Sequence, residues 1–207
     1  MEAGRLVGAV LVVGLAAFMV GAVRWRFAYE GPQDTALPAI HADRKRRAWI
    51  HSWMIAGVLV TSAGLAGLAT VLDAGTARTL AAMCATAYSL GAVCWIVSLT
   101  FGLTVVPWAA ERAVAEGRPP EAFTALDSWA SSLYLVHMLT SYLAFALLGV
   151  GVLADTDLPT ALGWIGVTWG LAFALGLAVP GRHQAAFYPP FWALTYPAVV
   201  GVTLLVW

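Results

Sequence analysis

The residues most able to do chemistry share one face of a predicted helix. At 100° per residue that face carries a carboxylate, hydroxyls, phenols and an imidazole: Asp127, Ser131, Tyr134, His137, Ser141 and Tyr142. His137 lies near the middle of its apolar stretch, and an ionisable group at membrane depth is a candidate site. The alternative is a neutral histidine bonded to a neighbouring helix, because a lone buried imidazole without a charged partner can do little acid–base work.

A second candidate feature is the proline inside the C-terminal apolar stretch. Pro197 removes a backbone hydrogen bond, so we expect a bend and a small gap beside it. An aromatic pocket with a few polar groups is the usual form of a small-molecule site. The predicted ligand-binding residues are Tyr134, His137, Ser141, Trp192 and Tyr196. If the protein is an enzyme, the predicted catalytic residues are Asp127, His137 and Tyr134.

No cofactor or metal site is predicted. Haem bound between His51 and His137 is disfavoured, because His137 is expected roughly 11 Å deeper in the membrane than His51. Cys84 and Cys94 fall on one predicted helix and cannot form a disulfide with each other within it. The sequence contains no P-loop, HExxH or GxSxG motif.

These residues lie in a chain dominated by long uncharged stretches. Hydrophobic residues make up 61% of the sequence and charged residues only 11%, against about 25% charged in a soluble domain. About 20 apolar residues span the hydrocarbon core as a helix, and lipid permits no other open-chain structure. We therefore predict an all-α fold, a single transmembrane domain over residues 1–207. It is a bundle of six helices, with spans at about 6–23, 48–72, 79–107, 128–154, 158–179 and 187–207.

The basic residues predict an orientation. Nine of the eleven lie in the connections after the first, third and fifth spans, and such residues are retained in the cytoplasm. Both termini are therefore expected outside. Pro107 is expected to begin a short interfacial helix over Trp108–Gly117. The Ala-, Gly- and Arg-rich composition is typical of a high-GC bacterial genome, which indicates the bacterial cytoplasmic (inner) membrane.

Four segments resemble parts of uncharacterised six-span integral membrane proteins of high-GC bacteria. They are Ile50–Leu65 (IHSWMIAGVLVTSAGL), Trp95–Ala110 (WIVSLTFGLTVVPWAA), Leu162–Gly176 (LGWIGVTWGLAFALG) and Pro189–Pro197 (PPFWALTYP). The resemblance implies the six-span fold over nearly the whole chain. It brings no established activity.

Two classes of function fit this sequence. The first is a non-enzymatic module that binds a hydrophobic ligand, a lipid or a partner membrane protein in its bundle. The second is a membrane-embedded enzyme on an apolar, isoprenoid-like substrate, such as a cyclase or isomerase, with aromatic faces stabilising a carbocation. The first is favoured because no two titratable groups converge by spacing. All charged residues lie outside the spans, which disfavours ion-coupled transport. The cluster Arg44–Arg47 is expected to touch anionic lipid rather than nucleic acid.

Overall fold

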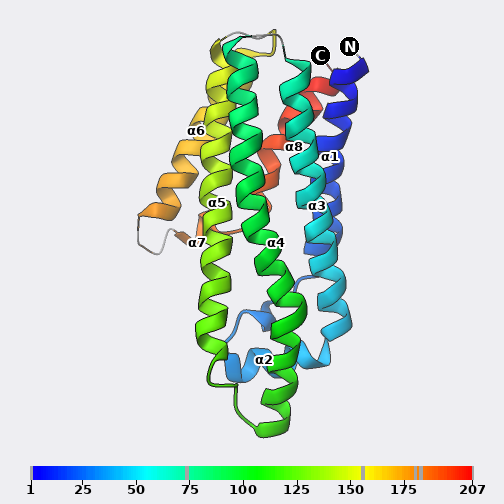
Figure 1. The fold of residues 1–207 in the computed structure, drawn as a ribbon, viewed down its shortest axis with the longest axis vertical. Coiled ribbons are helices and arrows are strands. Elements are labelled where there is room, and N and C mark those ends of the chain that lie inside the picture. Colours follow the sequence, from blue (N-terminus) through cyan, green and yellow to red (C-terminus); the bar gives the residue numbers. More distant parts are fainter. Residues whose placement is uncertain (1, 73–74, 155–156, 180, 182–183, 207) are drawn as a thin grey trace.

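The computed structural model is an elongated bundle of helices with both termini at one end (Figure 1). It describes residues 2–72, 75–154, 157–179, 181 and 184–206. These residues form helices and one 3-10 turn, with no strand among them. In chain order the elements are α1 (Glu2–Ala22), η1 (Phe27–Tyr29), α2 (Gln33–Ala42), α3 (Arg44–Val71), α4 (Thr76–Glu116), α5 (Phe123–Ala154), α6 (Thr160–Ala178), α7 (Gln184–Phe187) and α8 (Trp192–Val206).

Five helices are long and apolar enough to cross a membrane: α1, α3, α4, α5 and α6. The all-α membrane fold predicted from the sequence is confirmed at this level. The predicted sixth span coincides with α8, which is apolar but has only 15 residues. At 1.5 Å per residue it extends roughly 22 Å, short of the hydrocarbon thickness of about 30 Å. The chain enters α8 from α7 and the short segment that follows it (Figure 1).

The helix expected over Trp108–Gly117 is not a separate element. Instead, α4 continues through Pro107 to Glu116 and ends at Gly117, whose φ of 71° is left-handed. The buried face of α4 continues across the proline, with Val106 before it and Ala109 and Ala110 after it. There α2 packs against α4, inside a connection for which no helix was expected. This packing offsets the backbone hydrogen bond that Pro107 removes.

Small residues let the helices approach closely. The predicted Gly166–Gly170 pair faces α5, where Gly149 is so near that a methyl group on it would lie 2.5 Å from the Val167 backbone nitrogen. Likewise, a methyl group on Gly57 of α3 would lie 2.8 Å from the Gly14 carbonyl oxygen of α1. Without a hydrophobic driving force between helices in lipid, such van der Waals contact stabilises the bundle.

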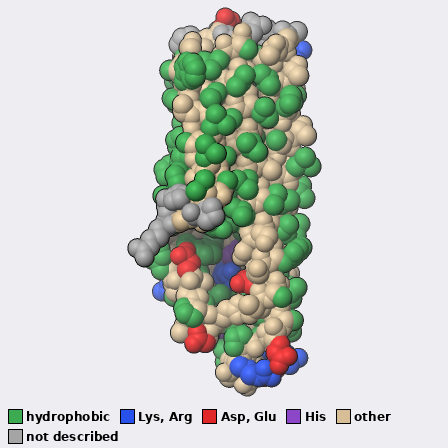
Figure 2. Space-filling model, turned by 90° about the vertical axis from the view of Figure 1, so that its left-hand side faces the viewer, with side chains coloured by type: hydrophobic (Ala, Val, Ile, Leu, Met, Phe, Trp, Pro, Cys, Tyr) green, Lys and Arg blue, Asp and Glu red, His purple; other side chains and the backbone are tan. Residues whose placement is uncertain are grey.

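The two ends of the bundle differ in thickness. α6 stops partway down the molecule, α7 follows, and α8 returns upward, while α3, α4 and α5 continue to the lower end (Figure 1). Hydrophobic side chains cover the upper part of the surface, and charged side chains concentrate toward the lower end (Figure 2). The lower part of the molecule is therefore built from fewer helices.

Candidate functional site

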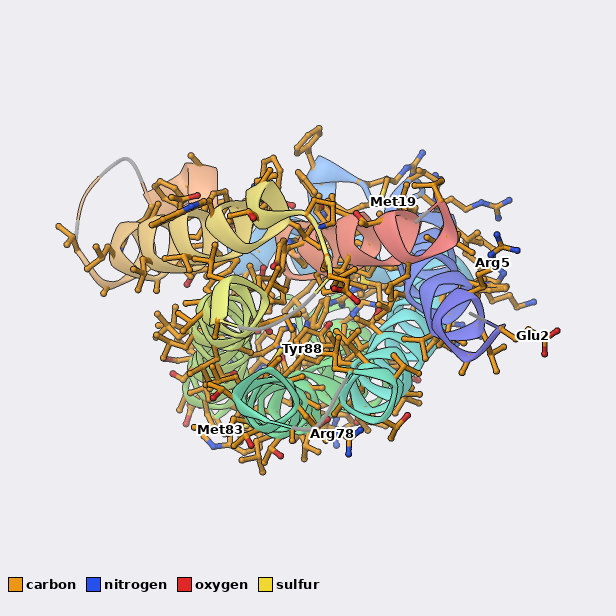
Figure 3. All side chains as sticks on the ribbon, turned by 90° about the horizontal axis from the view of Figure 1, so that it is seen from above. Glu2, Arg5, Met19, Arg78, Met83 and Tyr88 are labelled. Atoms are coloured by element: carbon orange, nitrogen blue, oxygen red, sulfur yellow. The ribbon has the colours of Figure 1, made fainter. Side chains whose placement is uncertain are left out.

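The polar face of α5 packs against α4 in the middle of the bundle. His137 and Ser141 are fully buried, and the His137 ring stacks on Trp95 with ring centroids 4.6 Å apart. Tyr88 of α4 meets the edge of the same imidazole at 5.7 Å. In the view from above, Tyr88 points into the interior while Met83 on the same helix points out (Figure 3). Ser131, further toward the lower end of α5, is exposed, unlike the rest of this predicted stripe.

This aromatic cluster extends to the C-terminal helix. Phe145 contacts both Tyr88 and Tyr196, with ring centroids 6.2 and 5.3 Å apart. Trp192 packs instead against Trp169 and Phe173 of α6. The structure thus brings Tyr134, His137 and Ser141 together around Trp95, and places Trp192 and Tyr196 in the continuation of the same aromatic core.

Most of the predicted polar groups already have partners in the protein. Tyr134 donates to the Tyr188 carbonyl, in the segment just before α8. Tyr196 donates to the Leu162 carbonyl at 3.2 Å and the Trp192 indole donates to the Ala186 carbonyl at 3.1 Å. These bonds hold α7 and α8 against α5 and α6.

Two polar atoms beside His137 have no well-formed hydrogen bond. The Nδ1 atom of His137 lies 3.3 Å from the Ser141 hydroxyl, while Nε2 is buried without a partner of good geometry, although the Gly91 backbone is a polar neighbour of the ring. The Tyr88 hydroxyl also has no hydrogen bond of good geometry; its polar neighbour is the hydroxyl of Thr61, which donates to the Gly57 carbonyl and keeps an oxygen able to accept. Buried polar atoms of this kind are uncommon, and an ordered water often satisfies them.

His51 occupies a different level from His137. Its Nδ1 atom lies 2.8 Å from the Arg47 carbonyl oxygen, and a methyl group on Gly102 would come within 2.5 Å of its Nε2 atom. His137 instead contacts Trp95, seven residues further up α4, or roughly 10 Å along the helix axis. One iron ligated by both rings would need them at one level, so this geometry gives haem ligation no support.

A hollow opens at the side of the lower bundle. Figure 2 shows it below the end of α6, with a histidine and a basic side chain on its floor and acidic side chains at its rim. Arg47 and His51 lie one turn apart near the start of α3, where the His51 ring and two nitrogen atoms of the Arg47 guanidinium are buried. The hollow exists because neither α6 nor α8 reaches this level (Figure 1).

Arg47 is the most unusual charged residue of the described chain. Its Nε and Nη1 atoms are buried and have no hydrogen-bond partner among the residues that the structure describes. Its guanidinium carbon lies 5.9 Å from the Tyr29 ring centroid, and Asp127 is the acidic residue whose charge acts on it. Asp127 forms no ion pair with it within 4 Å, so the charge is only partly compensated. Asp127 itself is ten residues before His137, about 15 Å along α5, and the two cannot act as an acid–base pair.

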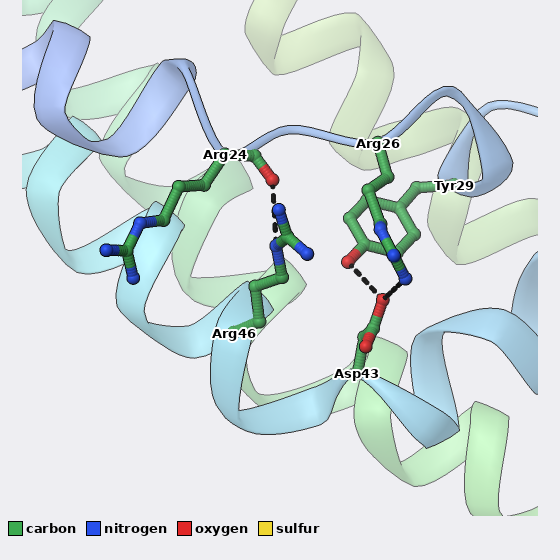
Figure 4. Close-up of polar contacts among 5 residues, drawn as sticks. All are labelled: Arg24, Arg26, Tyr29, Asp43 and Arg46. Atoms are coloured by element: carbon green, nitrogen blue, oxygen red, sulfur yellow. Dashed lines mark hydrogen bonds and ion pairs between the residues drawn. The ribbon is translucent and has the colours of Figure 1, made fainter.

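A polar network fixes the segment that closes the lower end. The Asp43 carboxylate accepts hydrogen bonds from Tyr29 at 2.9 Å and from Arg26 at 2.6 Å (Figure 4). The Tyr29 hydrogen bond, followed by that of Arg26, lowers the pKa of Asp43 below its usual value. Burial, and then the bond to Asp43, raises the pKa of Tyr29. This network joins η1 to the start of α3, directly beside Arg47.

Comparison with known proteins identifies no relative: no family model, curated protein or solved structure matches this chain. Sequence reasoning did not select Tyr88, Trp95 or Arg47. For Arg47 a signal existed, since it lies four residues before His51 and so shares the inward face of one helix.

Proposed function

We propose that this protein is a membrane-embedded binding module for an amphiphilic molecule. The polar head of the ligand would bind Arg47 in the hollow, and its apolar part would lie among the helices toward Tyr134 and Trp95. The observation that carries the proposal is the buried guanidinium of Arg47. Two of its nitrogen atoms donate no hydrogen bond to any of the described residues.

The energetic argument begins with desolvation. Moving a charged side chain out of water costs several kcal/mol, and a buried charge normally has a hydrogen-bonded counter-charge. A guanidinium offers a planar fork of donors suited to a carboxylate or phosphate. A ligand with such a head would restore the hydrogen bonds that Arg47 lacks.

The surroundings select an amphiphile rather than a simple anion. His51, Tyr29 and Trp25 border Arg47, and the ring centroids of Trp25 and His51 are 6.0 Å apart. Above them, Trp95 and Tyr134 pack with centroids 5.8 Å apart. Sites for small molecules are lined mainly by aromatic and apolar groups with a few orienting polar groups. This combination favours a head at Arg47 and an apolar body next to the rings.

The membrane setting is part of the same proposal. We place the protein in a bacterial inner membrane with the basic end in the cytoplasm and both termini outside. The partition of the basic residues supports this orientation. The hollow would then open at the cytoplasmic side of the membrane.

The test is to identify what the protein retains. The wild type, Arg47→Gln and a control, Arg118→Gln, would be purified identically in mild detergent. Arg118 is exposed and pairs with Glu121 at the lower end. Solvent extraction and mass spectrometry should find an amphiphile with an acidic or strongly polar head in the wild type and the control, and much less in Arg47→Gln. Equal recovery from all three proteins would contradict the proposal.

A further inference from the structure

A second concave site lies on the other side of the first turns of α3. It has a volume of about 520 Å³ and is lined by Arg24, Lys45, Arg46 and Trp49. Arg47 is not among its lining residues. This basic pocket is therefore separate from the hollow proposed above to bind the amphiphile.

Two contacts organise the basic pocket. Arg46 donates from Nε to the Arg24 carbonyl oxygen at 3.0 Å, which leaves the other guanidinium nitrogens of Arg46 free of that bond (Figure 4). The guanidinium carbon of Arg24 lies 4.2 Å from the Trp49 ring centroid, a cation–π contact. The end of α1 and the start of α3 are thereby tied together around the cavity.

The cations of the basic pocket form no close ion pairs. Among the described residues, ion pairs within 4 Å join Arg26 to Asp43, Arg112 to Glu116 and Arg118 to Glu121. Arg24, Lys45 and Arg46 take part in none of them. The nearby carboxylate of Asp43 already accepts from Tyr29 and Arg26. Three cations therefore face one cavity, and among the described residues none of them has an ion-pair partner within 4 Å, although the Asp43 charge acts on Arg46 from further away.

The basic pocket lies where the lipid-facing surface ends. Gly21 of α1 packs against Ile50 and Trp53 of α3, so Arg24 and Trp49 follow directly below that contact. Immediately above, Val20 and Val23 expose 40% and 71% of their surface. In a membrane these apolar side chains face acyl chains, and the adjacent cations stand at the depth of the phosphates.

We propose that the basic pocket binds the phosphate group of an anionic phospholipid. The phosphodiester would accept hydrogen bonds from Arg46 and Arg24 and form an ion pair with Lys45. The acyl chains of the lipid would lie along Val20 and Val23. Basic pockets between membrane helices on the cytoplasmic side bind lipid head groups in this way. A soluble phosphate would use the same cations but not the apolar surface.

The experiment measures lipid occupancy by native mass spectrometry. The delipidated full-length protein would be titrated with phosphatidylglycerol, with phosphatidylcholine and with inorganic phosphate. Lys45→Gln/Arg46→Gln is compared with Arg112→Gln/Arg118→Gln, which removes the same charge from the same end of the molecule. Thermal unfolding in phosphatidylcholine checks that each variant is folded. If the first double variant does not fold, Lys45→Gln alone replaces it, since the side chain of Lys45 makes no hydrogen bond or ion pair within the described structure.

The wild type and the Arg112/Arg118 variant should bind phosphatidylglycerol preferentially over phosphatidylcholine. A basic residue near an anionic surface contributes about 1 kcal/mol, or about a fivefold change in affinity. The pocket double variant should therefore bind phosphatidylglycerol at least about fivefold more weakly. If both double variants bind phosphatidylglycerol equally weakly, the affinity depends on general charge attraction, and the proposed binding in the basic pocket is wrong. Inorganic phosphate that competes with the lipid at equal concentration would overturn the lipid assignment.

Discussion

Arg47 shows how a single side chain can favour ligand binding over stability. Replacing a buried, incompletely paired charge with an apolar residue of similar length is often stabilising by about 1–4 kcal/mol. We therefore predict that Arg47→Met raises the unfolding temperature of the ligand-stripped protein. The same change should remove the stabilisation that added native extract gives to the wild type, which differential scanning fluorimetry would measure. A lower unfolding temperature in the stripped variant would show that Arg47 is structural.

His137 leads to a different prediction at the residue scale. Its ring fills a space between Trp95, Tyr88 and Ser141. His137→Ala should destabilise the bundle by about 2–4 kcal/mol, the usual result of deleting a large buried side chain. His137→Phe keeps most of the ring volume and should recover much of that loss. If His137→Phe is as unstable as His137→Ala, a hydrogen bond of the imidazole is essential.

At the scale of elements, the junction between η1 and α3 should respond to pH through Asp43. Its pKa is lowered in the folded protein, so its contribution to stability is present above its unfolded value of about 4 and is lost as the pH falls through the folded value. The unfolding temperature of the wild type should exceed that of Asp43→Asn at pH 7. The two curves should converge as the pH falls below about 4. A difference that persists unchanged at pH 3 would contradict this assignment.

The contact between α5 and α6 supplies another prediction for the elements. Gly149→Ala places a methyl group against the Val167 backbone nitrogen and the Gly163 carbonyl oxygen. Because neither is a flexible side chain, the helices must separate, at about 1–3 kcal/mol. The matched control is Gly4→Ala on α1, which would meet nothing within 4 Å. Thermal unfolding should fall for the first variant only.

The elements also show what the sequence could and could not predict. Hydropathy located the five long spans because a single apolar segment in lipid can satisfy its backbone hydrogen bonds only as a helix. It did not predict that α4 continues past Pro107, because that depends on packing against α2. Burial of His137 followed from the polar stripe on α5, whereas its partners Trp95 and Tyr88 depend on how α4 is rotated. The predicted count of six spans included α8, which has the composition of a span but only 15 residues, and five helices have both the length and the composition.

For the whole molecule, the orientation can be tested with single cysteines. In a Cys84→Ala/Cys94→Ala background, Thr76→Cys lies at one end of the bundle and Glu121→Cys at the other, and both positions are exposed. We expect a membrane-impermeant maleimide added to intact cells to label Thr76→Cys alone. Lysed cells serve as the control for reactivity at both positions. Labelling of Glu121→Cys alone in intact cells would reverse the orientation.

The central claim is that the hollow beside Arg47 holds the head of an amphiphile. An experimental density map of the protein purified without added ligand, by electron cryomicroscopy with a bound antibody fragment, tests it most directly. We predict elongated density in the hollow, with its polar end within hydrogen-bond distance of Arg47 Nε and Nη1 and its body toward Trp95 and Tyr134. An Arg47 guanidinium paired with the Asp127 carboxylate, and a hollow filled only by water or side chains, would contradict it.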